Sequence, residues 1–403
     1  MDFSSLSPAP PPSAVSDAAL HLAGPGSIGP EELYRGLGAI ITRETRVGEE
    51  VAALVVGTSG STGRPKKTVL SARALRSSGL ATEVATGTDG GAHWLLALPV
   101  HYVAGAQVVA RSILAGTRPV TTESIVSGSH FTARDFLDAV DRLGAGNRMT
   151  SLVPTQVHAL LEEVESGAVP ETDMLEALRS FDAILLGGAP ASSMLLSRCD
   201  ELRIPLVLTY GSAETAGGCV YDSHPLPGTR IAIEPSADES GAGRIWLGGP
   251  TLASGYLEDS ERTAESFRRD PEGVWWYRTD DLGRYTPESG LRVMGRADDV
   301  VMTGGVKVSA RAVARVLEED PTVREAIVVG VESPQWGQEI RAAVSRRPER
   351  DPDAKALTEL VRQRLGPAAA PKEIVVLDQL PQASTGKPDQ AAVRRLLEGS
   401  SVQ

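Results

Sequence analysis

A stretch rich in glycine, serine and threonine, VVGTSGSTGRPKK at residues 55–67, has the residue types of an anion-binding loop. A short apolar run enters it, and its polar part comprises Thr58, Ser59, Gly60, Ser61, Thr62 and Gly63, followed by Lys66. Glycines let the backbone approach an anion, hydroxyl and N–H groups donate to phosphate oxygens, and lysine adds charge. The spacing is neither that of a Walker loop nor that of a nucleophile elbow. It predicts a phosphate-binding loop, with a flexible Gly/Ser turn as the alternative.

This loop resembles the phosphate-binding loop of the adenylate-forming superfamily, which includes acyl-CoA synthetases, peptide-synthetase adenylation domains and luciferases. Counterparts of the family's later motifs follow in the same order: LPVHYVAG (98–105), LLGGAP (185–190), TYGSAE (209–214), YRTDDLG (277–283), GRADDVVMTGGVKV (295–308) and STGKPD (384–389). The resemblance spans roughly residues 51–390, and ordered co-occurrence is more specific than any single motif. It implies an ATP-dependent enzyme that forms an acyl-AMP and then transfers the acyl group to CoA.

The resemblance also assigns residues to the adenosine part of ATP. The LLGGAP turn corresponds to the segment that runs along the adenine, TYGSAE supplies the tyrosine that stacks on it, and YRTDDLG supplies an aspartate for the ribose. The implied nucleotide-binding residues, besides the phosphate loop, are Gly187, Gly188, Tyr210, Gly211, Asp281 and Arg296.

Attack of a carboxylate on the α-phosphate brings two anions together, so positive charge must surround the reacting groups. The resemblance implies that Glu214 holds Mg²⁺, which prefers hard carboxylate oxygens, and that Lys387 and Lys66 supply cationic charge. Loss of one such preorganised contact typically lowers the rate by about 10²–10³. The expected cofactors are therefore ATP and Mg²⁺, with CoA as co-substrate.

Two further positions are linked to movement of a small C-terminal domain. Asp298 resembles the hinge about which that domain turns between adenylation and thioester formation. Gly305 resembles the glycine that lines the pantetheine tunnel after the turn, where a Cβ would obstruct the thiol.

Two positions depart from the family pattern. Ala213 stands where threonine or serine is usual, so one hydroxyl contact to phosphate or Mg²⁺ is missing, and Asp280 replaces the usual glycine before Asp281. Neither change removes a charge that the chemistry requires, so any effect is expected on turnover.

The acyl pocket is less fully specified. LPVHYVAG resembles the family's Pro-x-x-His-x-x-Gly segment, which implies that His101 borders the acyl group, with a satisfied core histidine as the alternative. Ala189 and Ser212 are the other expected pocket residues. The short N-terminal part, together with LVPTQ (152–156), LLGGAP and TYGSAETAGGCVYD (209–222), resembles the compact o-succinylbenzoate–CoA ligases of menaquinone biosynthesis. Their substrate carries a second, aromatic carboxylate, so a cationic or hydrogen-bonding group is expected in the pocket, although the sequence does not identify it.

Three other functions stay open. One is a ligase for another aryl or medium-chain acid, and another is a non-catalytic acyl-adenylate-binding homologue, against which the joint presence of Lys66, Glu214, Asp281 and Lys387 argues. The third is a module that loads a carrier protein, which is disfavoured because no carrier serine motif occurs in the sixteen residues after Lys387.

Alternating strands and helices are expected to position these motifs. Apolar runs such as VAALVVG (51–57), HWLLALPV (93–100) and IPLVLTYGS (204–212) are typical of buried strands, whereas VVARSILAG (108–116) and FTARDFLDAVDRL (131–143) are typical of helices. The alternation predicts an α/β fold with largely parallel sheets, in which ligands bind beyond the carboxyl ends of the strands.

From Gly228 to about Tyr285, short runs separated by Gly and Pro predict a small antiparallel β subdomain. The C-terminal hundred residues alternate helix and strand again in an α+β style. The predicted organisation is an N-terminal AMP-binding and acyl-binding domain over residues 1–297 and a mobile C-terminal domain over residues 298–403 that carries the catalytic lysine.

Bulk properties limit the possible partners. The net charge of −12 lacks the basic field that nucleic acid or an acidic membrane requires, so small molecules (a carboxylic acid, ATP and CoA) are the expected partners. Cys199 and Cys219 are too few for a disulfide framework or a zinc site. With no secretory signal and no membrane-length apolar run, a cytoplasmic location is expected, and a homodimer is an open possibility.

Overall fold

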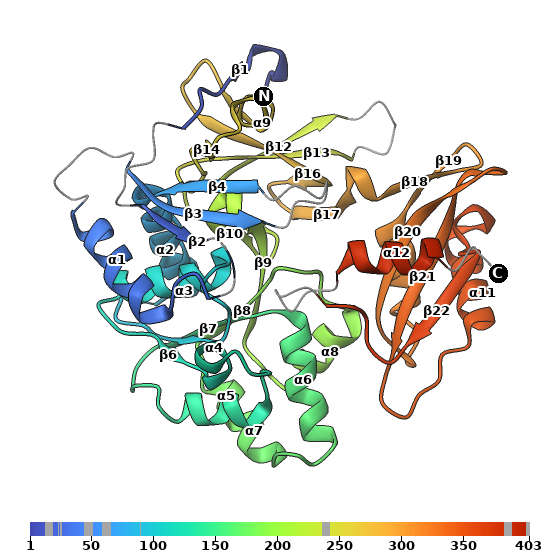
Figure 1. Cartoon of the computed structure of the whole chain (residues 1–403), viewed down its shortest axis with the longest axis horizontal. Helices are drawn as coiled ribbons and strands as arrows, with labels where there is room; N and C mark the ends of the chain where they lie inside the picture. The colour runs from blue at the N-terminus through green and yellow to red at the C-terminus, as the bar shows by residue number, and fades with distance from the viewer. Residues whose placement is uncertain are drawn as a thin grey trace.

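The computed structural model describes residues 1–12, 19–22, 24, 26–43, 51–58, 66–88, 90–235, 242–382 and 389–399. Figure 1 shows a large N-terminal body with a smaller C-terminal domain beside it. The α/β class is confirmed, because strands and helices alternate through both parts. No helix in the described ranges has the length and apolarity needed to cross a bilayer.

The centre of the large body is a seven-stranded sheet in the order β11-β10-β9-β8-β7-β5-β6. Its strands from β6 to β9 are parallel, whereas β9, β10 and β11 pair antiparallel. The bounds are β5 His93–Leu96, β6 Val120–Thr121, β7 Arg148–Leu152, β8 Ala183–Leu186, β9 Leu206–Ser212, β10 Gly217–Tyr221 and β11 His224–Pro225. The predicted strands in 93–100 and 204–212 are thus confirmed.

Alternate residues of these strands enter different cores, as a sheet covered on both faces requires. Trp94 and Leu96 of β5 join one hydrophobic core, and Leu95 between them joins the other. The first core contains residues of α1 (Pro30–Arg43), α2 (Ala72–Thr86) and α3 (Val103–Leu114). Residues of α5 (Ala133–Val140), α6 (Pro154–Glu165), α7 (Glu171–Arg179) and α8 (Ser193–Glu201) build the second core, and α4 (Glu123–Ser127) precedes α5.

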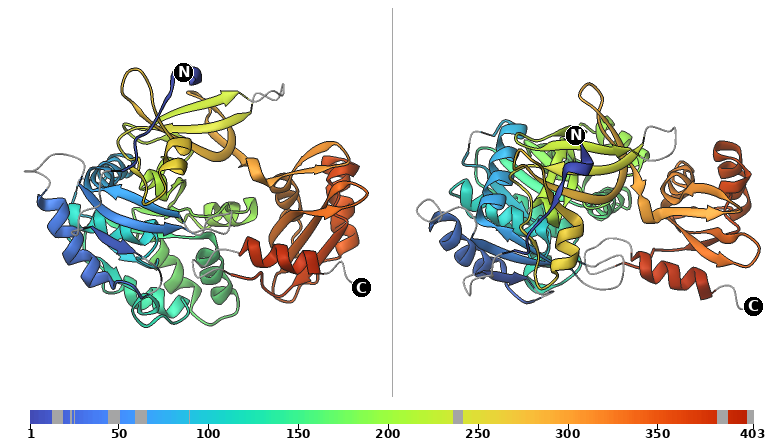
Figure 2. Two further views of the ribbon diagram at one scale, coloured as in Figure 1. Left: turned by 45° about the horizontal axis from the view of Figure 1, so that its top comes forward. Right: turned by 90° about the horizontal axis from the view of Figure 1, so that it is seen from above.

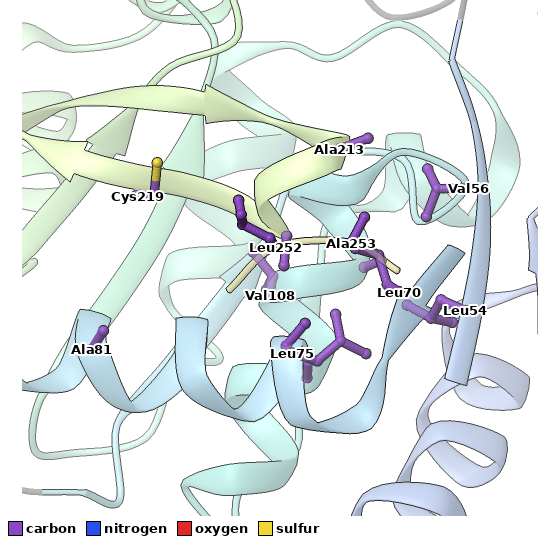
Figure 3. Close-up of a cluster of buried hydrophobic side chains, with 14 of the residues drawn as sticks. Leu54, Val56, Leu70, Leu75, Ala81, Val108, Ala213, Cys219, Leu252 and Ala253 are labelled. Atoms are coloured by element: carbon purple, nitrogen blue, oxygen red, sulfur yellow. The ribbon is translucent and has the colours of Figure 1, made fainter. Parts of the chain in front are cut away.

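A separate four-stranded sheet, in the order β14-β4-β3-β2, contains the strand that leads into the phosphate loop. The bounds are β2 Leu20–Leu22, β3 Ala52–Thr58, β4 Lys66–Ser71 and β14 Gly255–Tyr256. The expectation that the run 51–57 belongs to a largely parallel sheet was therefore wrong. β4 begins at Lys66, eight positions after β3 ends at Thr58, which is too close for a crossover connection, and the two strands pair antiparallel. Figure 3 shows the apolar side chains between these strands, α2 and α3.

The predicted antiparallel β subdomain is confirmed as a six-stranded sheet in the order β1-β15-β16-β13-β12, with β17 also paired to β16. Its N-terminal strand β1 pairs with β15, so the first residues of the chain close one edge. The elements here are η1 Phe3–Ser5, β1 Ser7–Pro8, β12 Arg230–Pro235, β13 Gly243–Gly248, α9 Ser260–Ser266, β15 Phe267–Arg269, β16 Trp275–Thr286 and β17 Gly290–Arg296.

The small domain has its own five-stranded sheet, in the order β19-β18-β21-β20 with β22 on β21, and its own cores. A short turn, η3 (Ala297–Asp299), connects it to β17. Its elements are β18 Val300–Thr303, β19 Val306–Ser309, α10 Ala310–Leu317, β20 Val323–Ser333, β21 Gly337–Arg346, α11 Ala354–Leu365, η4 Pro367–Ala369, β22 Glu373–Leu377 and α12 Gln390–Gly399. The backbone of Asp298 lies within η3, and the boundary at residues 297 and 298 stays a prediction.

Candidate active site

The predicted adenine-side glycines occupy positions that favour glycine, two because of close neighbouring atoms and one because of its backbone conformation. Gly187 follows β8, and a Cβ there would overlap Oγ1 of Thr209 in the neighbouring β9. A Cβ on Gly211 would overlap the Gly217 carbonyl oxygen. Gly188 has a φ of +82°, a left-handed conformation that favours glycine. The turn after β8 therefore lies directly against the β9–β10 hairpin.

Tyr210 and Asp281, assigned to adenine and ribose, meet across two sheets. The Tyr210 hydroxyl donates a 2.6 Å hydrogen bond to Oδ2 of Asp281, which lies on β16. Burial, and then the Asp281 carboxylate, raise the pKa of Tyr210 well above its ordinary value, so it stays a neutral donor. Arg296, at the end of β17, is the backbone register partner of Asp281. The three residues predicted around the adenosine therefore converge.

Glu214 is held almost fully buried, which is unusual for a carboxylate. It lies in η2 (Ala213–Thr215), where its backbone N–H donates to Oγ of Ser212 at 3.2 Å and its carbonyl accepts from the Ala253 N–H at 2.8 Å. The Tyr256 hydroxyl donates to its Oε1 at 2.9 Å. Burial and this carboxylate raise the pKa of Tyr256 above its ordinary value.

This setting fits a magnesium ligand. A preorganised carboxylate with one oxygen engaged by a neutral phenol keeps acceptor capacity for a hard cation. Among the described residues, no group of three or more histidine, cysteine, aspartate or glutamate side chains could hold a metal by itself. Glu214 would therefore share Mg²⁺ with the phosphate oxygens of the nucleotide.

The departure at Ala213 has a packing explanation. Its side chain is buried among apolar neighbours, and Figure 3 places it in the same cluster as Val56 and Leu252. A methyl group suits this environment, whereas a hydroxyl would need a partner. The hydroxyl of Ser212, directly before it, caps the η2 turn by accepting a hydrogen bond from the Glu214 N–H.

Asp280, the second position that departs from the family pattern, lies close to three cationic side chains. Its carboxylate lies 3.2 Å from Nη1 of Arg244, 3.3 Å from Nη2 of Arg296 and 4.0 Å from Nζ of Lys66. Lys66 is the first residue of β4, and its ammonium group also lies 5.7 Å from the centroid of the Tyr256 ring. Asp280 thus pairs with cations that lie beside the predicted phosphate and ribose positions.

His101 is buried beside Tyr102, with 4.0 Å between the ring centroids. Its Nε2 has no hydrogen-bond partner, and burial lowers the pKa of the ring, so it is neutral at pH 7. Counted from Pro99 to Gly105, however, the Pro-x-x-His-x-x-Gly pattern places its histidine at position 102, where this chain has tyrosine. His101 is therefore displaced by one position from the motif, and its pocket role stays a prediction.

Arg111 is a residue that the sequence analysis missed. It lies on α3 and is buried, yet no carboxylate in the described part of the chain pairs with it. Its Nη2 lies 3.3 Å from the Tyr221 hydroxyl, its Cζ lies 5.2 Å from the centroid of the Trp94 ring, and its Nε has no hydrogen-bond partner. The signal was present as one arginine within the apolar run VVARSIL.

Gln107, one turn before Arg111 on the same face of α3, connects this cation to the active-site hairpin. Its Nε2 donates to the carbonyl of Ala216 at 2.6 Å, while its Oε1 lacks a partner. Ala216 directly follows η2, which holds Glu214. Unsatisfied buried polar groups are uncommon, so Gln107 and Arg111 are candidates for contact with a bound polar ligand.

The remaining predicted residues are only partly placed. Thr58 ends β3, whereas Ser59, Gly60, Ser61, Thr62, Gly63 and Lys387 lie outside the described residues. Ala189 is half-buried after the Gly187 turn. Gly305 lies in the exposed β18–β19 turn with a φ of +81°, and nothing lies within 4 Å of the position that its Cβ would take.

Comparison with known proteins agrees with this geometry. A family model described as "AMP-binding enzyme" matches residues 15–257, and one described as "AMP-binding enzyme C-terminal domain" matches residues 312–387. The chain belongs to the AMP-binding enzyme family. The predicted family resemblance is thereby confirmed.

Two relatives within this family carry the same activity in their names. A probable 2-succinylbenzoate–CoA ligase of Mycobacterium tuberculosis is 39% identical over 364 residues, which cover 89% of this chain and 88% of the relative. The 2-succinylbenzoate–CoA ligase of Bacillus subtilis is 29% identical over 373 residues, covering 89% of this chain and 71% of the relative.

Solved structures add two neighbours. The o-succinylbenzoate CoA synthetase (MenE) of Bacillus subtilis, in complex with the acyl-adenylate OSB-AMP, gives a TM-score of 0.70 at 28% identity and covers 87% of this chain and 72% of its own. The amide bond synthetase McbA of Marinactinospora thermotolerans gives a TM-score of 0.71 at 28% identity, covering 86% and 69%. Fold similarity alone therefore does not separate a CoA ligase from an amide synthetase.

Proposed function

We propose that this AMP-binding enzyme is an AMP-forming acid–CoA ligase that converts o-succinylbenzoate to o-succinylbenzoyl-CoA in menaquinone biosynthesis. The observation that carries the substrate assignment is Arg111, a buried guanidinium beside the active-site hairpin that has no acidic partner among the described residues. A buried cation in an apolar setting is costly unless an anion meets it. The aromatic carboxylate of o-succinylbenzoate supplies that anion, whereas benzoate, octanoate and succinate lack a second carboxylate on an aromatic ring.

In the proposed adenylation step, the succinyl carboxylate attacks the α-phosphate of ATP and displaces pyrophosphate. Tyr210 and the Gly187 turn flank the adenine, and Asp281, held by the Tyr210 hydroxyl, accepts hydrogen bonds from the ribose. Lys66 and Lys387 provide positive charge for the phosphates, and Glu214 holds Mg²⁺, which neutralises phosphate charge when bound. The role of Lys387 rests on its family motif alone, and the other roles rest on the family motifs together with the contacts described above.

In the proposed second step, the CoA thiolate attacks the acyl carbon of the adenylate and AMP leaves. This step requires the thiol to reach the carbonyl, and Gly305, which lacks a side chain, suits the segment that would line its path. The small domain would turn about Asp298 between the two steps. The β18–β19 turn that contains Gly305 is exposed in the observed orientation.

The test is a comparison of acids. Purified enzyme with ATP and Mg²⁺ is incubated with o-succinylbenzoate, benzoate, octanoate or succinate, with and without CoA, and pyrophosphate release is followed. The proposal expects release with o-succinylbenzoate, a CoA thioester detected by mass spectrometry, and loss of both in Lys387→Ala. Release with a different acid would keep the enzyme class and remove the substrate assignment.

The same assay addresses the second candidate, an amide synthetase, which the similarity to McbA brings into consideration. Replacing CoA by simple amines tests whether the adenylate is consumed by nitrogen nucleophiles. Thioester formation with CoA and no amide with amines favours the ligase. ATP binding without turnover of any acid would instead favour a non-catalytic homologue.

We further propose that the enzyme acts in the cytoplasm, where ATP and CoA are available, and that it forms a homodimer. Sedimentation equilibrium at micromolar concentration tests the assembly, and a single species at the 42.4 kDa monomer mass would exclude the dimer. Cell fractionation tests the location.

A further inference from the structure

The small domain contacts the large body near the connecting turn. Arg315 of α10 donates from Nη2 to the carbonyl of Met294 on β17 at 3.3 Å. Gly295, with a φ of +149°, lies against Arg311, whose Cβ would be 3.3 Å from a Cβ at position 295. This contact sits beside the covalent connection, so it can act as a pivot without fixing the angle of the domain.

A second contact lies well away from the connection, between α6 of the large body and the start of β20. Nε of Arg324 lies 3.0 Å from Oε1 of Glu162, and their side chains are only 15% and 23% exposed. The two atoms are close enough for an ion pair, although they lack hydrogen-bond geometry. Figure 1 shows α6 and the small domain on facing sides of the gap between the two bodies.

The surroundings of this pair make it energetically significant. His158, one turn before Glu162 on α6, is buried, and both residues lie within the electrostatic reach of Arg324 and Arg347. Removing one partner of a buried ion pair leaves the other charge unpaired and desolvated. If the small domain turned away, both side chains would regain water, so loss of one partner favours turned orientations over the observed one.

The observed orientation can be matched to a step of the proposed reaction. Met302 and Val306, which flank the Gly305 turn, are 44% and 48% exposed, so this turn is not packed against the large body. Figures 1 and 2 instead show α12 on the side of the small domain that faces the large body. This is the orientation expected for adenylation, because the Gly305 segment is withdrawn.

We propose that Glu162 and Arg324 form an interdomain ion pair that holds the small domain in the adenylation orientation and must open before thioester formation. They are positioning residues, since neither touches the reacting groups. The proposal rests on the proposed function for the step that it assigns, although the ion pair itself can be tested without turnover.

The decisive experiment separates the two half-reactions. Glu162→Gln and Arg324→Gln are each expected to lower acid-dependent pyrophosphate–ATP exchange about tenfold, since a lost pair shifts the orientation equilibrium by that order. Thioester formation from supplied acyl-AMP and CoA should be unchanged or faster. The exchanged pair, Glu162→Arg with Arg324→Glu, should recover adenylation to within about threefold of the parent.

A matched control uses Glu359 and Arg362 on α11, an ion pair 2.9 Å apart that is exposed and lies within the small domain. Glu359→Gln should change neither half-reaction, since exposed pairs contribute little. An equal fall of both half-reactions in Glu162→Gln, or no recovery in the exchanged pair, would overturn the proposal.

A readout independent of activity keeps the test distinct from that of the proposed function. Spin labels on Glu176→Cys of α7 and Lys355→Cys of α11 report the interdomain distance, and the two native cysteines are buried. In Glu162→Gln the distance distribution should shift or broaden, and in the exchanged pair it should return. An unchanged distribution refutes the ion pair's role even if the enzyme turns over o-succinylbenzoate.

Discussion

The two ends of the proposed active site differ in how their cationic side chains are paired. At the end that we propose for the acyl group, Arg111 is buried beside a phenol and an indole ring, and no carboxylate of the described ranges pairs with it. At the nucleotide end, Lys66, Arg244 and Arg296 all surround Asp280, which is half-exposed. The proposed acyl end therefore has a buried charge that a ligand carboxylate can pair with, whereas at the nucleotide end a carboxylate of the protein already contacts three cations.

This difference suggests how each end of the site selects its ligand. A desolvated, unpaired cation rejects ligands that lack an anion, because the site's polar group then stays unsatisfied. A solvated cluster with an internal counter-ion exchanges partners at low cost, which suits a nucleotide that must bind and leave in each cycle. Glu214, a further carboxylate at this site, is buried and hydrogen-bonded to Tyr256.

The largest effect is expected from Glu214→Gln. The amide keeps a hydrogen bond with Tyr256 but removes the negative charge offered to Mg²⁺, so the adenylation rate should fall about 10²–10³-fold. Stopped-flow pyrophosphate release as a function of Mg²⁺ concentration measures it. Tyr256→Phe is the control and should lose far less, and a Gln variant with normal Mg²⁺ dependence would remove Glu214 from the metal site.

Arg111→Met tests the acyl end directly. Loss of a charge-assisted contact to the aromatic carboxylate should lower kcat/KM for o-succinylbenzoate about 10- to 100-fold. The matched substrate is 4-oxo-4-phenylbutanoate, which is the same acid without the ring carboxylate and should react equally well with parent and variant. Equal losses for both acids would indicate that Arg111 only supports the fold, which thermal unfolding would register.

Asp280→Asn tests the nucleotide end of the site. Without the carboxylate, Lys66, Arg244 and Arg296 are available to the phosphates, so KM for ATP should fall about threefold with kcat unchanged, a small effect because the cluster is solvated. Initial-rate kinetics at saturating acid measure it. A rise in KM would show instead that Asp280 holds these cations in position for the nucleotide.

His158 extends the comparison to a buried side chain that is neutral at pH 7. Burial, together with Arg324 and Arg347, lowers the pKa of His158 to about 4. The unfolded chain, with an ordinary histidine pKa near 6.5, binds this proton first as pH falls. The folded state should therefore lose about 1 kcal/mol of unfolding free energy between pH 7 and 5.5.

Urea denaturation at the two pH values measures this loss, with His158→Gln as the comparison. The variant should lack that part of the pH dependence. The pKa of Glu162 is raised by burial, so its contribution runs in the opposite direction and remains in both proteins. An identical pH dependence in parent and variant would contradict the assignment to His158.

Several strands and helices, and the family, could be predicted from local sequence. Short apolar runs gave rise to the expected strands β3, β5 and β9, and the helical stretches to α3 and α5, because backbone preference and side-chain periodicity act over a few residues. The order of motifs likewise indicated the family and the residues around the adenosine. Tyr210 and Asp281, 71 positions apart, do meet as their motifs implied.

Tertiary structure decided what depends on which distant surfaces come together. It placed β3 in a second, mixed sheet, brought Arg111 to Tyr221 over 110 positions, and gathered three cations on Asp280. It also set Glu162 against Arg324, which join two domains. No local pattern predicts these contacts. The energetic effect of a buried charge depends on which side chains surround it, and those side chains come from distant parts of the sequence.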